Sequence, residues 1–292
     1  MKLFTGLDQI VKYDEPLAKH CWMGIGGPAR YFITPRNRQE LAEVVKRCRE
    51  NDLAMLVLGQ GANLLVLSKR VDAAVIHLGS EGFSQIEIED RRLRAAAGAD
   101  LPRLVRQCIR AGLSGLEPLV GIPGTLGGGV RMNAGGRFGD IGAAISSVEV
   151  MDSAGRIYTR SKEELVFGYR RTNIAAKFIL QACFDLEPDD PQRVLRQAKQ
   201  MWIYKKNTQP LANKSAGCVF RNPRGLSAGA LIDQAGLKGQ RVGGAMISPV
   251  HANFIVVDKS AQPKDMQELI SLMRQKVQEK FEVSLELELE IW

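Results

Sequence analysis

The chain has 292 residues, of which 45% are hydrophobic and 25% charged, an ordinary composition for a globular protein of one large domain or two to three smaller ones. No apolar run reaches the roughly 18 residues that a membrane span needs. The N-terminus also lacks the apolar core of a secretion signal, so we expect a cytoplasmic protein without a membrane partner. The net charge of +8 comes from 40 Lys and Arg against 32 Asp and Glu. Because these basic residues are dispersed and aromatic residues make up only 6%, the charge suits small polyanionic ligands better than nucleic acid.

The first third of the chain predicts short strands that alternate with helices. We expect strands at 29–33, 54–58, 71–78, 85–88 and 92–97. Asn37 begins a helix, with Glu40 as its capping-box partner and with the apolar stripe Leu41, Val44, Val45 and Cys48. Asp100 begins a second helix, which Gly112 ends, with the apolar stripe Leu101, Leu104, Val105, Cys108 and Ile109.

Two glycine-rich segments interrupt these elements. Residues 59–66, GQGANLLV, join two apolar strands by a turn whose successive N–H groups can converge on an anion. No GxGxxG opens a helix there, which excludes a Rossmann fingerprint. In the segment from Gly121 to Gly139, GIPGTLGGGVRMNAGGRFG, eight of nineteen residues are glycine, a density that disfavours helices and strands. We interpret both segments as loops that wrap a large phosphate-bearing cofactor; the alternative is a set of tight turns between strands.

The second half predicts a different arrangement of elements. A hairpin is expected from strands at 146–151 and 156–159, then a strand at 178–186. The sequence EPDDP from residue 187 marks a candidate domain boundary. The next helix has the stripe Val194, Leu195, Ala198, Met201 and Trp202, and Pro263 opens a last helix with the face Met266, Leu269, Ile270, Met273, Val277 and Phe281. Strict alternation of hydrophobic and polar residues from Val283 to Ile291 predicts a terminal strand.

Three groups in the second half are candidates for chemistry. Arg170 beside Tyr169 can hold a carboxylate or phosphate by two hydrogen bonds, or can be a solvated loop arginine. Five cysteines without a CxxC pair predict neither a zinc site nor a disulfide framework. Among them Cys218, in AGCVFRNP, is either an accessible thiol or a small buried hydrophobe. One of the glutamates on the terminal strand can be the buried acid of a site, although such a row usually faces solvent.

Eight motifs that occur in order resemble the UDP-N-acetylenolpyruvoylglucosamine reductase (MurB) family. They span about residues 17–292 and read HCWMGIGGPARYF, GQGANLLV, GIPGTLGGGVRMNAGG, FGYRRT, SAGCVFRNP, LIDQAGLKG, HANFIV and LELEL. The resemblance implies an α+β fold with a two-part FAD-binding domain of the vanillyl-alcohol-oxidase (PCMH) type at 1–187, split near 70–80. An α+β substrate domain at 188–292 would follow, and its terminal strand would return toward the flavin.

The resemblance also implies an activity. Members of the family are cytoplasmic flavoenzymes of peptidoglycan precursor synthesis. NADPH reduces their FAD, and the flavin then reduces UDP-N-acetylglucosamine enolpyruvate to UDP-N-acetylmuramate. The implied partner is therefore a small molecule, this UDP-sugar enolpyruvyl ether, and the implied state is a monomer or weak dimer.

The family's motifs assign roles to single residues of this sequence. Arg170 and Glu288 match the residues that stabilise the substrate carboxylate, and Cys218 matches the donor of a proton to C2. The implied FAD-binding residues are Gly59, Gly61, Ala62, Asn63, Leu64, Leu65, Ile122, Pro123, Gly124, Thr125, Gly128, Asn133, Ala134 and Gly135. The residues implied to line the substrate or its UDP are Tyr169, Lys206, Asn222, Gln234, His251 and Asn253.

The sequence departs from the family pattern in three places. Cys218 stands where serine is usual, and a thiol is larger and more acidic. The ending LELEL replaces LEPEV, which leaves Glu286 as a weaker candidate for the role of Glu288. The short stretch at 172–177 indicates the shorter family type, which lacks the tyrosine-bearing loop that caps the substrate.

Two other functions remain as alternatives at this point. An FAD-dependent alcohol or sugar oxidase would share the cofactor fold, but the absence of a histidine near 59–66 for covalent flavin attachment and the presence of AGCVFRNP count against it. A non-enzymatic nucleotide-binding or nucleic-acid-binding module is disfavoured by the dispersed charge. No metal site is expected.

Overall fold

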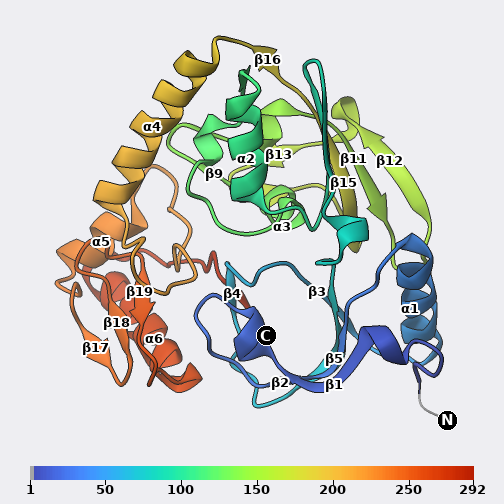
Figure 1. Cartoon of the computed structure of the whole chain (residues 1–292). Coiled ribbons are helices and arrows are strands. Elements are labelled where there is room, and N and C mark those ends of the chain that lie inside the picture. The colour runs from blue at the N-terminus through green and yellow to red at the C-terminus, as the bar shows by residue number, and fades with distance from the viewer. Residues whose placement is uncertain (1–2) are drawn as a thin grey trace. The chain divides into compact units, whose positions relative to one another are not determined.

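The chain forms two compact units, each with a hydrophobic core of its own, in a computed structural model that describes residues 3–292 (Figure 1). The first unit comprises the described residues up to Glu15 together with Ala29–Gly59 and Asp72–Tyr204. The second unit comprises Pro16–Pro28, Gln60–Val71 and Lys205–Trp292. The functional domain boundary expected at residue 187 stays a prediction, because compact packing units and functional domains need not coincide.

A four-stranded sheet with the order β1-β2-β5-β3 begins the first unit. Its strands are β1 (Val11–Pro16), β2 (Pro28–Ile33), β5 (Val71–His77) and β3 (Met55–Leu58), and β3 runs parallel to β5. Helix α1 (Arg38–Glu50) precedes β3. The predicted cap is confirmed, since Asn37 Oδ1 accepts the N–H of Glu40 at 2.9 Å, and the predicted stripe is buried. The capping box is wrong, because the Glu40 carboxylate accepts the N–H of Arg36 instead.

A five-stranded antiparallel sheet with the order β12-β11-β15-β7-β6 is the larger layer of the first unit. Its strands are β6 (Ile86–Glu89), β7 (Arg92–Ala96), β11 (Ile145–Met151), β12 (Ile157–Ser161) and β15 (Phe178–Asp185). The predicted second helix is α2 (Leu101–Arg110), whose N-terminal N–H groups are capped by Asp100 as expected. Gly112 follows it at φ +68°, a conformation that glycine adopts without strain.

The long glycine-rich segment contains a helix that the sequence does not predict. Helix α3 (Leu126–Arg131) includes Gly127, Gly128 and Gly129, and it packs against β15. A Cβ atom on Gly127 would lie 2.9 Å from the Cβ of Ala97, so this close approach requires glycine. Thr125 caps the helix, its Oγ1 accepting the N–H of Gly128 at 3.4 Å. Tertiary packing therefore outweighs the poor helix propensity of glycine here.

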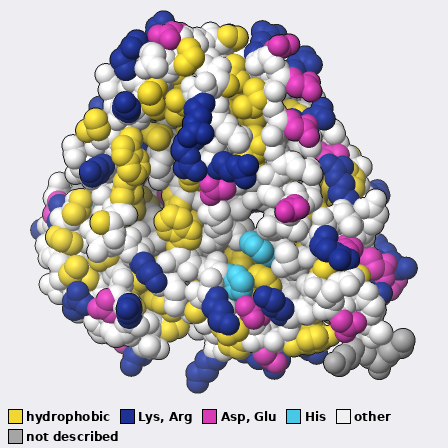
Figure 2. Space-filling model, viewed as in Figure 1, with side chains coloured by type: hydrophobic (Ala, Val, Ile, Leu, Met, Phe, Trp, Pro, Cys, Tyr) yellow, Lys and Arg dark blue, Asp and Glu magenta, His cyan; other side chains and the backbone are white. Residues whose placement is uncertain are grey.

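Helix α4 (Pro191–Thr208) continues the chain from the first unit into the second. Its Val194 and Ala198 join the first core as predicted. Trp202 is 40% exposed, so the predicted apolar stripe is wrong for the last turns of the helix. Figure 2 shows hydrophobic side chains at the surface over α4, together with basic side chains that are spread over this face rather than gathered in one block.

The second unit combines two helices with a small sheet. Helices α5 (Ala228–Gln234) and α6 (Pro263–Phe281) pack against each other. Strands β17 (Arg241–Val242), β18 (Ala245–Ile247) and β19 (Ile255–Val257) form an antiparallel sheet. On α6 the predicted face is confirmed by five buried residues, Met266, Leu269, Ile270, Met273 and Val277.

The predicted terminal strand is much shorter than its alternating pattern suggests. Only Glu290–Ile291 form a ladder, β20, which runs parallel to β4 (Leu64–Leu65). Leu285 and Leu289 are buried, but Ile291 is 36% exposed. The alternating pattern therefore predicts which side chains near the end of the chain are buried better than it predicts which residues pair with another strand.

Six two-residue strands complete the fold. They form the pairs β8 (Leu113–Ser114) with β16 (Glu187–Pro188), β9 (Gly135–Gly136) with β10 (Gly139–Asp140), and β13 (Phe167–Gly168) with β14 (Arg171–Thr172). Within residues 3–292, no helix is long and apolar enough to cross a membrane. The same residues contain no cluster of His, Cys, Asp or Glu that can hold a metal ion.

Candidate active site

The residues expected to act in catalysis and binding are divided between the two units. The first unit holds Gly59, the candidates at 122–135, Tyr169 and Arg170. The second unit holds the candidates at 61–65, Cys218, Glu288 and the five remaining substrate candidates.

In the first unit, the two glycine-rich segments meet at Thr125. A Cβ atom on Gly59 would lie 2.5 Å from the Oγ1 of Thr125, so the end of β3 and the start of α3 pack without room for a side chain. Gly124, next to Thr125, is buried at φ +116°. Its N–H group forms no hydrogen bond within residues 3–292. A buried, unpaired N–H group is costly unless a ligand or water accepts from it.

In the second unit, Gly61 is required by both its backbone and its surroundings. It adopts φ +63°, and a Cβ atom there would lie 2.4 Å from the carbonyl oxygen of His20. As far as the structure describes the chain, the N–H groups of Gly61 and Ala62 have no acceptor. These two donors fit a ligand with phosphate oxygens, such as the FAD expected from the sequence.

The C-terminal strand lies directly beside this loop. The side-chain amide of Asn63 donates to the carbonyl oxygen of Glu288 at 2.9 Å, and the N–H of Glu290 donates to the carbonyl oxygen of Asn63 at 3.0 Å. Leu64 and Leu65 pair with Glu290 and Ile291. The second unit thus joins the candidate acid Glu288 to the predicted cofactor loop 61–65.

The segment that carries Cys218 is the next neighbour of Glu288. The carbonyl oxygen of Val219, one residue after Cys218, accepts the N–H of Glu288 at 2.9 Å. Cys218 itself is half-buried and forms a β-bridge with Phe254. The structure therefore brings the predicted thiol and the predicted acid onto adjacent backbones.

Glu286 and Glu288 differ in their surroundings. The Glu286 side chain is 80% exposed and lies 3.9 Å from the guanidinium of Arg221. Glu288 is half-buried, and both its N–H and its C=O are hydrogen-bonded. The geometry thus favours Glu288 over Glu286 as the acid of a site.

Arg170 lies at the tip of the β13–β14 hairpin in the first unit. Its φ of +54° is uncommon for a residue with a side chain and costs roughly 1–2 kcal/mol. Such strain often accompanies a functional constraint. The guanidinium carbon lies 5.2 Å from the ring centre of Tyr169, which is 51% exposed.

Asn133 ties this hairpin to the predicted cofactor segment. Its side-chain amide donates to the carbonyl oxygen of Gly168 at 3.0 Å, and its Oδ1 accepts the N–H of Gly142 at 3.0 Å. Asn133 is 2% exposed and has φ +46°. The sequence places it on a cofactor loop, but the long-range contact to the Arg170 hairpin is visible only in the structure.

The remaining substrate candidates of the second unit have different environments. His251 is half-buried, and burial, with a contribution from Lys238, holds its pKa below the usual value. Its Nδ1 accepts the N–H of Asn253 at 3.2 Å, which needs the neutral ring. Asn222 Oδ1 accepts the N–H of Ala228 at 3.0 Å, and Gln234 is exposed at the end of α5.

Two features of the second unit escape the sequence reasoning. Lys206 is exposed, whereas its neighbour Lys205 is 6% exposed. Asn253 is 2% exposed and bonds the main chain of Phe220 at both ends of its amide. The position of Lys205 in its helix does not indicate burial. For Asn253, the sequence alone cannot distinguish a side chain that bonds the main chain from one that bonds a ligand.

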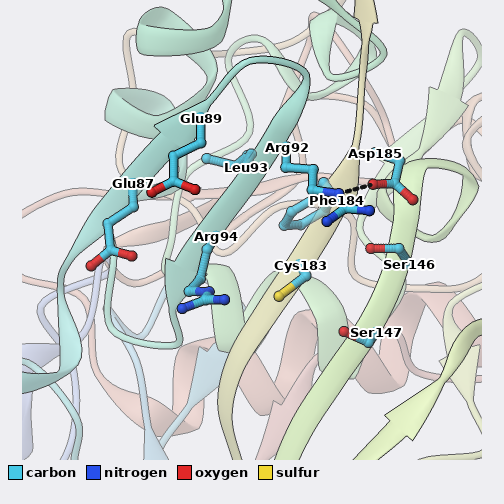
Figure 3. Close-up of a pocket in the computed structure, with 10 residues that line it drawn as sticks. All are labelled: Glu87, Glu89, Arg92, Leu93, Arg94, Ser146, Ser147, Cys183, Phe184 and Asp185. Atoms are coloured by element: carbon cyan, nitrogen blue, oxygen red, sulfur yellow. Dashed lines mark ion pairs between the residues drawn. The ribbon is translucent and has the colours of Figure 1, made fainter.

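A separate hollow lies on the five-stranded sheet of the first unit (Figure 3). It encloses about 400 Å³, and its lining is Glu87, Glu89, Arg92, Leu93, Arg94, Ser146, Ser147, Cys183, Phe184 and Asp185. Arg92 and Asp185 form an ion pair across it at 3.7 Å. None of the predicted site residues lines this hollow, so it lends no support to their assignment.

Comparison with known proteins identifies relatives along the whole chain. Residues 209–292 match the C-terminal domain of UDP-N-acetylenolpyruvoylglucosamine reductase, and residues 29–161 match an FAD binding domain. A UDP-N-acetylenolpyruvoylglucosamine reductase of Heliobacterium modesticaldum is 41% identical over 90% of this chain and 85% of its own length. One of Bacillus subtilis is 37% identical over 95% of this chain and 92% of its own length.

Solved structures agree with these matches. The crystal structure of the MurB reductase from Thermus caldophilus has a TM-score of 0.83 and 41% identity, and the match covers 97% of this chain and 98% of that one. A Phl p 4 variant described as a glucose oxidase has a TM-score of 0.50 and 15% identity, over 65% of this chain and 45% of its own. The second match shows a shared fold alone.

Proposed function

The chain belongs to the UDP-N-acetylenolpyruvoylglucosamine reductase family, and we propose that it reduces UDP-N-acetylglucosamine enolpyruvate to UDP-N-acetylmuramate, with NADPH as electron donor and FAD as cofactor. The main support is the similarity over the whole chain, which includes both the FAD-binding part and the family's C-terminal domain. This reaction is a step in the synthesis of peptidoglycan precursors. The proposal includes a cytoplasmic location and a monomer or weak dimer.

The cofactor would be held by the two glycine-rich segments. The unpaired N–H group of Gly124 in the first unit and those of Gly61 and Ala62 in the second are suitable donors to phosphate oxygens. When bound, reduced FAD would supply the hydride that is added to C3 of the enolpyruvyl group. The protein's own residues must then orient the substrate and control charge and protons.

Arg170 and Glu288 would act on the substrate carboxylate. Negative charge builds there as the hydride is added, and a guanidinium can hold the carboxylate by two hydrogen bonds. Arg170 lies at the hairpin tip, and Asn133 bonds Gly168, which directly precedes that tip. Glu288 would assist at the same carboxylate from its place beside loop 61–65.

Cys218 would complete the reduction by a proton transfer. The hydride adds to C3 and the thiol proton to C2, so the carbon–carbon double bond becomes single and a thiolate remains on Cys218 until it regains a proton from solvent. A general acid must lie within hydrogen-bonding reach of the reacting atom. The half-buried position of Cys218 beside the Glu288 backbone supports this role.

An absorbance experiment tests the proposed function. Purified protein should carry the spectrum of oxidised flavin, NADPH should bleach it, and UDP-N-acetylglucosamine enolpyruvate should restore it. A colourless protein that does not bind added FAD would refute the proposal. Hydrogen peroxide production from an alcohol or sugar, without reductase activity, would instead indicate an oxidase of the same cofactor fold.

A further inference from the structure

In the second unit, the side chain of Asn253 bonds the main chain of Phe220 as a neighbouring strand would. Its Oδ1 accepts the N–H of Phe220 at 3.0 Å, and its Nδ2 donates to the carbonyl oxygen of Phe220 at 2.7 Å. Its own carbonyl oxygen accepts the N–H of Val219 at 2.8 Å. The residue is 2% exposed, so its amide serves the main chain and not the solvent.

The other edge of the same segment holds the C-terminal residues. Phe220 forms a β-bridge with Leu287, and the carbonyl oxygen of Val219 accepts the N–H of Glu288 at 2.9 Å. The segment that follows Cys218 is therefore fixed between Asn253 on one side and the Glu288 strand on the other. Glu288 is held a second time by Asn63, whose amide donates to its carbonyl oxygen.

These contacts form one continuous chain from Asn253 to the predicted cofactor loop. Asn253 fixes Phe220 and Val219, Val219 fixes Glu288, and Glu288 is bonded to Asn63. Loss of the Asn253 amide would leave a buried N–H and a buried C=O of Phe220 without partners. The main chain that carries Cys218 would then shift relative to Glu288.

We propose that Asn253 is a positioning residue that sets the place of the Cys218 thiol relative to Glu288, and that it does not contact the substrate. The inference rests on the proposed function, because the thiol and the acid act together only in that reaction. It replaces the substrate-lining role that the resemblance implies for Asn253. A displacement of about 1 Å in a catalytic group can reduce a rate by about 10²-fold.

The test uses the flavin-loaded full chain with Asn253→Ala and Asn253→Asp. Stopped-flow absorbance separates reduction of the flavin by NADPH from its reoxidation by the enolpyruvyl substrate. We expect normal reduction, an unchanged substrate Kd, and a limiting rate of reoxidation that is about 10–100-fold lower in Asn253→Ala. Asn253→Asp keeps the side-chain volume and the acceptor for the N–H of Phe220, so it carries the test if the alanine variant does not fold.

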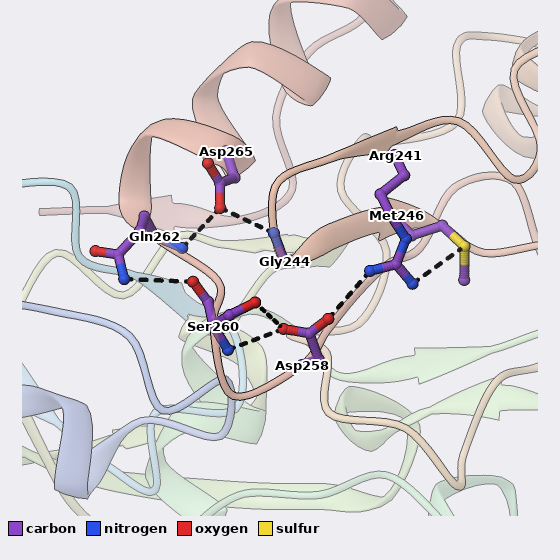
Figure 4. A network of polar contacts seen from close by, with 7 residues as sticks. All are labelled: Arg241, Gly244, Met246, Asp258, Ser260, Gln262 and Asp265. Carbon is purple, nitrogen blue, oxygen red and sulfur yellow. Dashed lines mark hydrogen bonds and ion pairs between the residues drawn. The ribbon is translucent and has the colours of Figure 1, made fainter.

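Asp265→Ala is the matched control (Figure 4). Asp265 is also buried in the second unit, at 4% exposure, and also serves the main chain, because its carboxylate accepts the N–H groups of Gly244 and Gln262. Its loss should lower thermal stability but leave the rate of reoxidation near that of wild type. A second readout is a double-mutant cycle, in which Cys218→Ala should cost much less in the Asn253→Ala background than in wild type.

Three results would overturn the inference. They are an unchanged reoxidation rate in a folded Asn253 variant, a weakened substrate Kd with a normal limiting rate, and an equal rate loss in Asp265→Ala. The second would return Asn253 to substrate contact, and the third would reduce its role to stability. Failure of the proposed function is distinguishable, because the reduced flavin of wild type would then not be reoxidised by the substrate at all.

Discussion

The suitability of the Cys218 thiol as a proton donor depends on where the main chain holds it. Its half-buried thiol follows Gly217, which adopts φ +79°, and precedes a residue bonded to Glu288. In the three buried cysteines, Cys21, Cys48 and Cys108, burial raises the pKa of the thiol to about 11 or 12. A thiol that is only partly withdrawn from solvent is better suited to proton transfer than these three.

Substitution of Cys218 should separate the two half-reactions. Cys218→Ala removes the proton donor, so we expect reoxidation of the flavin by substrate to slow by about 10²–10⁴-fold while reduction by NADPH stays near normal. Cys218→Ser keeps a hydroxyl donor and should retain much of the activity. Stopped-flow absorbance measures both steps, and an unaffected reoxidation rate in Cys218→Ala would show that another group protonates C2.

The pKa of His251 should make folding stability depend on pH. Because burial lowers this pKa in the folded state, the unfolded chain binds more protons below pH about 6.5. The stability contributed by the neutral ring is therefore complete above about 6.5 and is lost as the pH falls from there toward the folded-state pKa. Thermal unfolding from pH 8 to 5 should show a loss of Tm that is smaller in His251→Gln; equal losses in both proteins would assign the effect to other groups.

Short contacts between distant segments are the main feature at the scale of elements. Loop 59–66 meets Thr125 through Gly59 in the first unit, and it pairs with β20 through Leu64 and Leu65 in the second. Within this loop, Gly61 disfavours substitution for two reasons: its φ is positive, and the carbonyl oxygen of His20 lies where a Cβ atom would be. A mutation in this loop should therefore affect the cofactor more than the overall fold.

Gly61→Ala should weaken FAD binding. The added Cβ would lie 2.4 Å from the His20 carbonyl oxygen, in a backbone conformation that costs an alanine roughly 1 kcal/mol or more. We expect a protein that purifies with less flavin and has an FAD Kd raised about tenfold, measured by flavin fluorescence. Gly225→Ala is the control, because Gly225 has φ +74° but no atom within 4 Å of the added Cβ. If both variants bind FAD equally, the steric contact at Gly61 does not matter for the cofactor.

Shortening the chain tests the terminal strand as an element. Removal of Glu290–Trp292 deletes β20 and the carbonyl oxygen of Trp292, which accepts the N–H groups of Leu67 and Ser68. Because the loop 61–65 then loses its partner strand, we expect lower FAD retention and slower reoxidation, measured as above. Full cofactor content in the shortened protein would show that loop 61–65 holds its shape without β20.

The molecule as a whole carries a net charge of +8, and on the face that Figure 2 shows the basic side chains are spread and not gathered in one block. Both proposed small-molecule partners, NADPH and the UDP-sugar, are polyanions, so long-range attraction should raise their encounter rates. This steering is screened by salt, whose Debye length is about 10 Å at 0.1 M.

The apparent KM for NADPH and for the UDP-sugar should therefore rise several-fold between roughly 0.05 and 0.5 M salt, while kcat changes little. Steady-state kinetics at constant pH measure this, with sucrose at matched osmolality as the control for non-ionic effects. KM values that do not depend on salt would show that the net charge has no part in substrate capture.

Features that depend on neighbours a few residues apart can be predicted from the amino-acid sequence alone. The caps of α1 and α2, the buried stripe of α6 and the hairpin predicted at 146–159, which the structure has as Ile145–Met151 with Ile157–Ser161, follow from hydrogen bonds and periodicities within short windows. The eight motifs that occur in order also indicated the family, because each of them is a short stretch of consecutive residues. These features need no knowledge of the tertiary structure.

Which distant segments meet is visible only in the tertiary structure. It showed that Asn63 bonds Glu288, 225 residues away, that Asn253 fixes Phe220, and that glycines 127–129 form a helix. The alternating pattern at the C-terminus could not predict that Glu290–Ile291 form a parallel ladder with β4 while Leu287 makes only an isolated bridge to Phe220. Such contacts escape a short window of sequence because they depend on the register and packing of whole elements.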